Sequence, residues 1–239
     1  MSHFLVADDD ARGRVERKRD ARAAAILDGA MAILAAEGLE ALTLGRLAKS
    51  LDVVPAALYR YFDSKDALVA ALQRRAVGVI HEGLRGALGA RGEVTGRAAP
   101  EVAILAKLLG GARFYLALPR TEPEAFFLVA LLVGDPRPLL SDEESRKTAP
   151  LLLALLSDVE EMFRIAAERG ALTKGDSIER TLAFWAVLQG ALSLEKMRRI
   201  APTLPSATDV AGAAAATLLV GWGASPAHIK RAQRLIERG

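Results

Sequence analysis

The stretch that decides the fold runs from Thr43 to Leu68 and reads TLGRLAKSLDVVPAALYRYFDSKDAL. Thr43 stands where a helix N-cap belongs, and the apolar residues after it predict a short helix of about two turns. Pro55 fits the first position of a second short helix, because that position needs no backbone N–H. Two short helices joined by a tight turn are typical of a helix-turn-helix, here about residues 43–62, whose second helix enters the major groove of DNA.

The helical pattern continues on both sides of this motif. Upstream, apolar residues at helical spacing predict a helix from Arg19 to Glu37, and Gly38 suits the left-handed position that ends it. Downstream, Ser64 caps a helix that begins at Lys65. The glycine-rich stretch from Gly86 to Pro100 predicts a frayed helix end and a loop between domains.

The rest of the chain is also helical by its spacing of apolar residues. Helices are predicted over 101–118, 122–133, 148–169, 176–200, 206–223 and 225–238. No alternating run of β-branched residues predicts a strand. The fold class is therefore all-α with about ten helices.

Composition excludes several classes of protein. A chain of 239 residues with 51% hydrophobic content is too large and too apolar for disorder or a small disulfide scaffold. The absence of cysteine removes thiolate catalysis, iron–sulfur clusters and zinc fingers, and favours a cytoplasmic location. Three scattered histidines and the lack of any catalytic or phosphate-binding motif predict no metal site, no cofactor and no catalytic residues.

Neither secretion nor a membrane span is expected. Aspartates at positions 8–10 stand where a signal peptide would be basic and then apolar. The longest uncharged run, 210–229, is rich in alanine and glycine and is broken by Pro226. It therefore favours a buried interface helix over a membrane span.

Positive charge is concentrated near the N-terminus. Between residues 11 and 22, six basic residues face two acidic ones, a net charge of +4 in a chain whose total is +3. A solvated helix start explains such a segment, and a contact with a polyanion is the sharper interpretation.

The residues at 42–44, 47–48 and 51–53, followed by the string LYRYFDSKDAL at 58–68, resemble the N-terminal domain of TetR-type transcriptional regulators. The resemblance covers about residues 19–72. It implies three domains: an N-terminal arm at 1–18, a helix-turn-helix DNA-binding domain at 19–75, and a helical ligand-binding and dimerisation domain at 76–239.

Physical reasons support DNA contacts by several residues of this string. Tyr59 and Tyr61 carry hydroxyls on rigid rings that can reach phosphate oxygens. Lys65 lies in the first turn of a helix, where the dipole already favours an anion. Arg60 can contact a phosphate or a guanine edge, and Leu58 and Phe62 are expected to face inward.

The resemblance assigns the remaining DNA-binding positions. The residues expected to approach base edges of DNA are Val54, Pro55, Ala56 and Ala57. Thr43 and Arg46 are expected to approach the sugar-phosphate backbone of DNA. The basic arm, with Arg17, Lys18, Arg19 and Arg22, would add phosphate or minor-groove contacts.

Two positions depart from the family pattern. Asp52 stands where glycine is usual, because the turn requires a left-handed backbone that Asp adopts at some cost. Val54 replaces a small polar cap and cannot accept hydrogen bonds from the helix that follows. The sequence from Val54 to Ala57 offers no polar side chain, so selectivity would depend on thymine methyl groups, on Arg60 and on DNA shape.

Helix-turn-helix proteins of this type bind the two half-sites of a pseudo-palindromic operator with two copies of the DNA-binding domain, so a homodimer is expected. The helices at 176–200 and 206–223 carry small and apolar residues suited to a four-helix bundle with a partner. The predicted interface comprises Leu182, Ala186, Gly190, Gly212, Ala213, Ala216 and Val220. Core packing inside a monomer is the alternative explanation of these residues.

Aromatic residues of the C-terminal domain predict an apolar cavity for a small-molecule effector. The predicted pocket residues are Arg113, Phe114, Phe126, Phe163, Trp185 and Gln189. For each aromatic taken singly, an ordinary core role is the competing interpretation.

The function expected from the resemblance is sequence-specific regulation of transcription, with repression relieved when a small apolar ligand binds. An enzyme that uses Glu160 and Glu161 is disfavoured, because adjacent positions on a helix do not converge. The remaining alternative is a protein-interaction or ligand-carrier module that has lost DNA binding, since the face at 54–57 lacks groups for direct readout.

Overall fold

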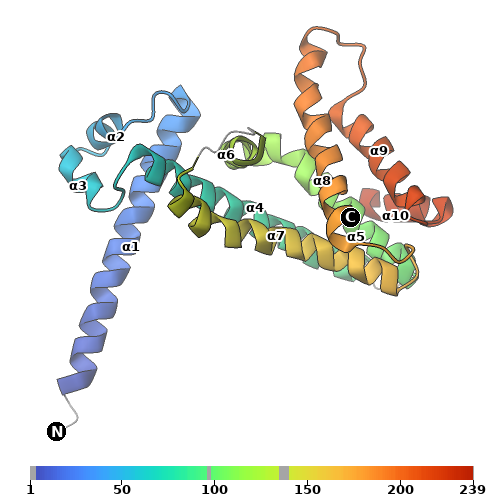
Figure 1. Ribbon diagram of the computed structural model, residues 1–239, viewed down its shortest axis with the longest axis horizontal. Helices are drawn as coiled ribbons and strands as arrows, with labels where there is room; N and C mark the ends of the chain where they lie inside the picture. Colours follow the sequence, from blue (N-terminus) through green and yellow to red (C-terminus); the bar gives the residue numbers. More distant parts are fainter. Residues whose placement is uncertain (1–3, 96–97, 135–139, 239) are drawn as a thin grey trace. The chain divides into compact units, whose positions relative to one another are not determined.

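The computed structural model describes residues 4–95, 98–134 and 140–238, with side chains over 14–89, 98–133 and 140–237. The elements are α1 (Phe4–Glu37), α2 (Leu44–Ser50), α3 (Pro55–Tyr59), α4 (Lys65–Thr95), α5 (Pro100–Thr121), α6 (Pro123–Gly134), α7 (Asp142–Glu168), α8 (Ser177–Leu194), the 3₁₀ helix η1 (Glu195–Arg199), α9 (Ala207–Gly221) and α10 (Pro226–Arg238) (Figure 1). No strand occurs in these ranges. The predicted all-α class with about ten helices is confirmed.

Contacts divide the chain into two compact units. Unit 1 comprises Met1–Ala76 and Phe127–Thr148, and unit 2 comprises Val77–Phe126 and Ala149–Gly239. Helices α4, α6 and α7 contribute residues to both units. The short helices α2 and α3 belong to unit 1, whereas α5, α8, α9 and α10 belong to unit 2.

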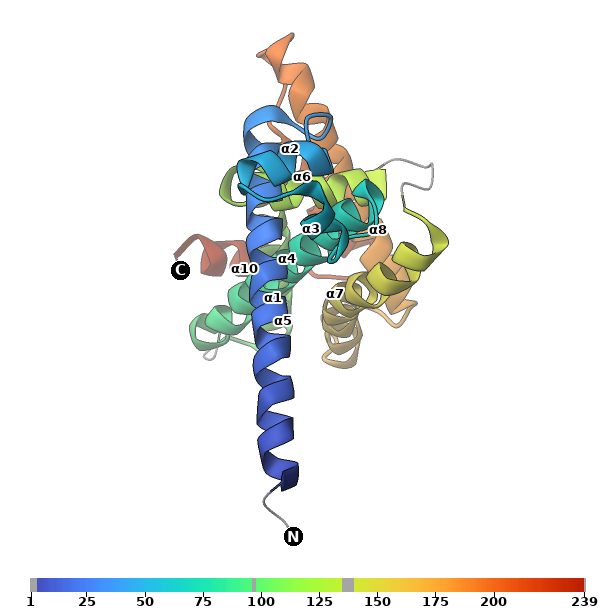
Figure 2. The same cartoon turned by 90° about the vertical axis from the view of Figure 1, so that its left-hand side faces the viewer.

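Helices α1, α2 and α3 share an apolar core in unit 1. Ile26 of α1, Leu47 of α2 and Leu58 of α3 are each at most 1% exposed. Gly29 allows close approach, because a Cβ there would lie 2.9 Å from Leu51 Cδ2. In Figures 1 and 2, α2 and α3 lie near the C-terminal end of α1, and the N-terminal half of α1 extends away from them.

Three predicted helix ends of unit 1, the end of α1 and the starts of α2 and α4, are confirmed. Gly38 follows α1 with φ +83°, in the left-handed region that favours glycine. Thr43 Oγ1 accepts a hydrogen bond from Arg46 N at 3.1 Å, and Ser64 Oγ accepts one from Ala67 N at 3.0 Å. These bonds satisfy N–H groups in the first turns of α2 and α4.

Polar contacts also connect α4 to the second segment of unit 1. Arg74 Nη1 donates to Glu144 Oε2 at 2.6 Å, and Gln73 Nε2 lies 3.5 Å from the Leu128 carbonyl oxygen. Burial raises the pKa of the Glu144 carboxyl. Hydrogen bonds from Lys147 and Arg74 lower it by more than burial raises it, so the pKa lies below its ordinary value. The contact therefore pairs an ionised carboxylate with a guanidinium.

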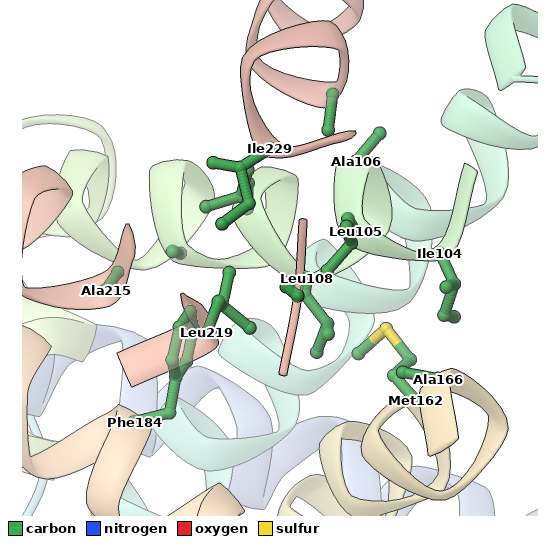
Figure 3. Close-up of a cluster of buried hydrophobic side chains, with 14 of the residues drawn as sticks. Ile104, Leu105, Ala106, Leu108, Met162, Ala166, Phe184, Ala215, Leu219 and Ile229 are labelled. Carbon is green, nitrogen blue, oxygen red and sulfur yellow. The ribbon is translucent and has the colours of Figure 1, made fainter. Parts of the chain in front are cut away.

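Unit 2 is organised around a larger apolar cluster. Side chains from α5, α7, α8, α9 and α10 gather in it, and Figure 3 shows part of the cluster. The ring of Phe163 meets the rings of Phe184 and Trp222 edge-on, each with centroids 5.5 Å apart. Such contacts fix how α7, α8 and the end of α9 pack together.

Several expected helix boundaries are wrong. Helix α7 begins at Asp142 rather than at 148, and α8 ends at Leu194, where a 3₁₀ helix follows, rather than at 200. The first helix begins at Phe4 rather than Arg19, and α4 continues to Thr95, through most of the loop predicted from Gly86 to Pro100. Each glycine costs a helix only about 1 kcal/mol relative to alanine, so scattered glycines do not end α4. In the N-terminal segment, residues of opposite charge at i, i+4 spacing in the sequence, such as Asp8 and Arg12, favour a helix.

Helix α5 is the one helix in the described ranges that is long and apolar enough to cross a membrane. Half of its apolar window is buried inside the protein, and Leu105 and Leu108 belong to the unit 2 core. Core packing therefore accounts for its apolar character.

Candidate functional site

The outward surface of α3 is the candidate interface with DNA. Leu58 and Phe62 are 1% and 8% exposed and face the core of unit 1, as predicted. Val54 and Tyr59 are 68% and 53% exposed, and Pro55 and Ala56 are exposed beside them. The burial pattern thus turns the expected base-reading positions toward solvent, with Ala57 half-buried among them.

The turn before α3 has the geometry that the family pattern demands. Asp52 has φ +53° and is the one non-glycine residue with positive φ among the described residues. Val53 N donates to the Ala48 carbonyl oxygen at 3.0 Å, which closes the turn onto α2. Val54 is the N-cap of α3 and forms no side-chain cap, and Pro55 occupies the first turn as predicted.

The cations around α3 differ in their pairing. Arg46 Nη2 donates to Glu37 Oε1 at 2.6 Å, and this hydrogen bond and the carboxylate charge raise the pKa of Arg46 above its ordinary value. Lys65 Nζ donates to the Leu39 carbonyl oxygen at 3.2 Å. Tyr59, Arg60 and Tyr61 form no side-chain hydrogen bond or ion pair within the described residues, so their polar groups are available to a ligand.

The basic arm is helical. Arg17, Lys18, Arg19 and Arg22 lie on α1, and all four are exposed. None of them has an ion-pair partner in the described part of the chain. Because successive residues of a helix point about 100° apart, these charges are distributed around the helix axis and do not form one stripe.

A second candidate site is a small cavity in unit 2. It measures about 60 Å³ and is lined by side chains of α4, α5, α7 and α8, including Phe114 and Trp185 from the predicted pocket. Tyr115, which the prediction did not include, donates to Gln189 Oε1 at 2.6 Å and accepts from Trp185 Nε1 at 3.0 Å. Burial raises the pKa of Tyr115 to about 12, an effect that the Trp185 hydrogen bond partly opposes.

The other predicted pocket residues are dispersed. Phe163 is 1% exposed in the core, and Phe126 packs edge-on against Tyr115 with centroids 6.1 Å apart. Arg113 is exposed and, with Phe114, lines a larger groove of about 670 Å³. Sequence reasoning missed this groove; its signal was the face of α5 from Leu109 to Arg120, where lining residues recur at helical spacing.

An exposed apolar surface follows α8 and α9. Leu182 and Val220 are 44% and 45% exposed. Ala186, Gly190 and Ala213 are exposed, and Gly212 and Ala216 are half-buried. The surface continues beyond the predicted set to Ile178 and Leu194, which are 40% and 53% exposed.

No group of three or more metal-ligating side chains comes together among the described residues. The polar groups of unit 1 near α3 include hydroxyls, a guanidinium and an ammonium, beside the exposed carboxylates of Asp52 and Asp63. The hydroxyls, the guanidinium and the ammonium can bind anions and hydrogen-bond acceptors, as the backbone and base edges of DNA require.

Comparisons with known proteins agree with this arrangement. Residues 26–72 match the model for bacterial regulatory proteins of the tetR family. No curated protein sequence matches the chain. Among solved structures, the regulatory protein SCO4313 is 27% identical with a TM-score of 0.59, and the alignment covers 86% of this chain and 98% of that one.

Two further structures share the fold at lower identity. AibR, solved in complex with isovaleryl coenzyme A and operator DNA, is 18% identical with a TM-score of 0.58, covering 83% of this chain and 98% of its own. RolR, solved with the ligand resorcinol, is 16% identical with a TM-score of 0.58, covering 94% and 97%. The shared architecture therefore extends well beyond the helix-turn-helix.

Proposed function

We propose that this chain, a member of the TetR family of bacterial regulatory proteins, is a repressor that binds a pseudo-palindromic operator as a homodimer and is released by a small molecule. The observation that carries the proposal is the surface of α3. Three of its four predicted base-reading residues are exposed, and Tyr59 and Arg60 present polar groups without partners in the described residues. The match over residues 26–72 supports the same assignment.

Each side chain of this surface has a distinct proposed role. Tyr59, Tyr61 and Lys65 bind phosphate oxygens on either side of the major groove. Arg60 reaches a phosphate or a guanine edge. The apolar face at 54–57 contacts thymine methyl groups, and Thr43 approaches the neighbouring sugar-phosphate backbone of the DNA.

Arg46 is proposed to contact the DNA backbone, but unlike the other cations it must first share or break an ion pair. Its guanidinium is paired with Glu37, so a phosphate contact requires either a shared geometry or release of the carboxylate. A guanidinium has five N–H donors, which permits sharing. We therefore expect Arg46 to contribute less to the salt dependence of binding than Lys65 does.

The helical arm extends the electrostatic contact. An α-helix is about 10 Å across, whereas the minor groove is about 6 Å wide, so the arm as a helix favours phosphate contacts over minor-groove insertion. Each phosphate that the arm neutralises releases counterions and steepens the salt dependence of binding. Replacing Arg17, Lys18, Arg19 and Arg22 together by glutamine is expected to lower affinity for every duplex.

Dimerisation is proposed through the exposed face of α8 and α9. Leu182 and Val220 would leave water on association, and Ala186, Gly190 and Ala213 permit close approach of two helix pairs. Isologous pairing of this face would provide the two DNA-binding domains that a pseudo-palindromic operator requires.

Release by a ligand is proposed from the C-terminal unit. The solved relatives AibR and RolR hold small molecules, and the groove and cavity of unit 2 offer apolar space. Helix α4 contributes residues to both units, so a ligand that favours one position of α4 also biases unit 1. A coupling of roughly 1 to 3 kcal/mol suffices to shift the DNA-binding equilibrium.

The decisive experiment is a titration of the protein onto genomic fragments, including the DNA that flanks its own gene, at several salt concentrations. Specific binding with a steep negative salt slope is expected. Competition with a scrambled duplex separates specific from non-specific affinity. Equal affinity for all duplexes, or none, would contradict the proposal.

A second function is favoured by one observation. The sequence Val-Pro-Ala-Ala at 54–57 lacks any polar side chain and is largely exposed, as a protein-interaction or ligand-carrier module without DNA binding would allow. The same titration separates the two functions, because such a module would bind no duplex while retaining its ligand.

A further inference from the structure

Unit 2 contains a groove of about 670 Å³ between α5, α9 and α10. One wall is a continuous face of α5, since Leu109, Ala112, Leu116 and other lining residues recur at spacings of three and four. From Leu109 to Arg120 this wall extends about 16 Å along the helix axis. The groove is therefore long enough for an extended chain.

The groove and the small cavity differ in what they can hold. A cavity of about 60 Å³ accommodates on the order of two water molecules, because each water occupies about 30 Å³ in the liquid. Ligand sites measure roughly 300 to 1,000 Å³, and the groove lies within that range. Unlike the cavity, the groove can receive a small molecule without rearrangement of its walls.

The walls of the groove are apolar along most of their length and charged at a few points. Alanines and leucines from α5, α8 and α9 form the apolar part, with Ala211 and Ala215 on the α9 side. The charged lining residues are Arg113 and Arg120 of α5 and Glu237 of α10. The lining thus carries a net charge of +1, which matches a ligand with one negative charge.

The two guanidiniums are differently placed. Arg113 Nη1 donates to the Ile236 carbonyl oxygen at 2.5 Å, which ties α5 to the last turn of α10. Arg120 has no hydrogen bond or ion pair within the described residues. Its planar group is therefore free to bind a carboxylate through two parallel hydrogen bonds.

Glycine keeps the α9 wall open. A Cβ built on Gly212 meets no atom within 4 Å, although this residue lies in the middle of α9 and lines the groove. Glycine inside a helix costs about 1 kcal/mol relative to alanine. The absence of a side chain here preserves free volume where a ligand tail would lie.

From the apolar wall, the unpaired guanidinium and the single net charge, we infer that this groove binds a free carboxylic acid with a medium-length unbranched tail. The carboxylate lies at Arg120, and the tail runs along α5 toward Leu109 past Gly212. The inference rests on the proposed function, because it makes this acid the effector that releases DNA.

Calorimetric titration of the full-length protein with octanoate, octanol and octanoyl coenzyme A tests this inference. Octanoate should bind at least tenfold more tightly than octanol, since only octanoate forms charge-assisted hydrogen bonds with Arg120. Octanoyl coenzyme A should bind more weakly than octanoate, because its several negative charges exceed what the lining can neutralise. Tighter binding of the thioester, equal binding of the alcohol, or no binding of octanoate would overturn the inference.

Variants locate the ligand. Arg120→Gln should weaken octanoate binding about tenfold and leave octanol binding unchanged, and Arg120→Lys should restore part of the loss. The matched control Lys174→Gln removes an exposed charge of unit 2 outside the groove and should change neither ligand. Equal octanoate affinity in Arg120→Gln and Lys174→Gln would overturn the assignment of the carboxylate.

Filling the groove provides an independent test. Gly212→Phe should abolish binding of both octanoate and octanol, whereas Gly86→Phe, at another helical glycine with open space around it, should bind both normally. Sedimentation of Gly212→Phe checks its subunit assembly. If this variant loses assembly and still binds octanoate, a second copy of the chain occupies the groove and the inference falls.

The same titrations distinguish this inference from the proposed function. Octanoate binding is measured without DNA, and release of a bound operator fragment is measured separately. A protein that binds its operator but not octanoate keeps the proposed function and loses the groove assignment. A protein that binds octanoate in the groove but no duplex loses the proposed function instead.

Discussion

The Lys65 ammonium donates a hydrogen bond from Nζ to the Leu39 carbonyl oxygen at 3.2 Å, which anchors the first residue of α4 to the turn after α1. An ammonium has three N–H donors, so two remain for a phosphate. One side chain therefore links the internal packing of unit 1 to its proposed contact with DNA.

Lys65→Ala is expected to weaken binding of all duplexes by a similar factor and to reduce the magnitude of the salt slope by about 0.9, as loss of one phosphate contact requires. Loss of the bond to Leu39 should also lower the free energy of unfolding by about 1 kcal/mol. DNA titrations at several salt concentrations and urea denaturation measure the two effects. An unchanged salt slope would remove Lys65 from the interface.

Tyr59→Phe separates DNA binding from stability. The hydroxyl of Tyr59 has no partner among the described residues and its side chain is 53% exposed, so its removal should leave the free energy of unfolding unchanged. Loss of one hydrogen bond to phosphate should lower affinity about fivefold, equivalent to about 1 kcal/mol. Titration of a specific and a scrambled duplex should show the same loss for both, and full retention of affinity would contradict the phosphate contact.

Asp52→Gly is expected to stabilise the protein by about 0.5 to 1 kcal/mol, because Asp52 adopts φ +53° and glycine enters this region without steric cost. Asp52→Ala should destabilise by a similar amount or more. Denaturation midpoints of the three proteins test this order. If alanine were as stable as glycine at this position, the backbone would not be strained there.

Leu182→Glu tests the proposed dimer. A charge on the exposed face of α8 would lose its hydration on association, so the variant should sediment near the 25.4 kDa of one chain, and the natural protein at twice that mass. Leu153→Glu on α7, where the leucine is 60% exposed outside the proposed interface, is the matched control and should remain dimeric. A dimeric Leu182→Glu would exclude this face.

Tyr115 predicts a loss of stability at high pH. Its pKa is about 12 in the folded protein and near 10 when unfolded, so the unfolded chain releases the proton first as pH rises. The stabilisation is fully present below about pH 10 and is lost between about pH 10 and 12.

Tyr115→Phe provides the comparison for that measurement. The variant should be less stable at neutral pH by about 1 to 3 kcal/mol, because Gln189 Oε1 and Trp185 Nε1 lose their shared partner. The difference between the two proteins should shrink as pH rises from about 10 to 12. A constant difference would mean that Tyr115 does not titrate in this range.

Features set by neighbours in the chain were predictable from sequence. Thr43, Ser64 and Gly38 act on backbone groups within a few residues, and all three form the expected caps or turns. The left-handed conformation of Asp52 followed from the family pattern, since a tight turn imposes it on whichever residue stands there.

Features set by distant segments were not predictable. The partner of Lys65 lies 26 residues away, and Phe163 and Phe114 cannot be sorted into core and groove without knowing which helices cover them. The groove itself combines α5 with α10, more than a hundred residues later. The start of α1 and the end of α4 were missed for a different reason: residues with high helix propensity outweigh the scattered glycines.

The apolar surface at Val54, Pro55, Ala56 and Ala57 has a consequence for how such a regulator diverges. Under the proposed function, a polar residue acquired at one of these positions would add a base contact without first destroying another, while the proposed phosphate contacts of Tyr59, Tyr61 and Lys65 would maintain overall affinity. If the chain binds DNA as proposed, new target preferences would arise in single mutational steps. After gene duplication, the two copies have a short route to controlling different promoters.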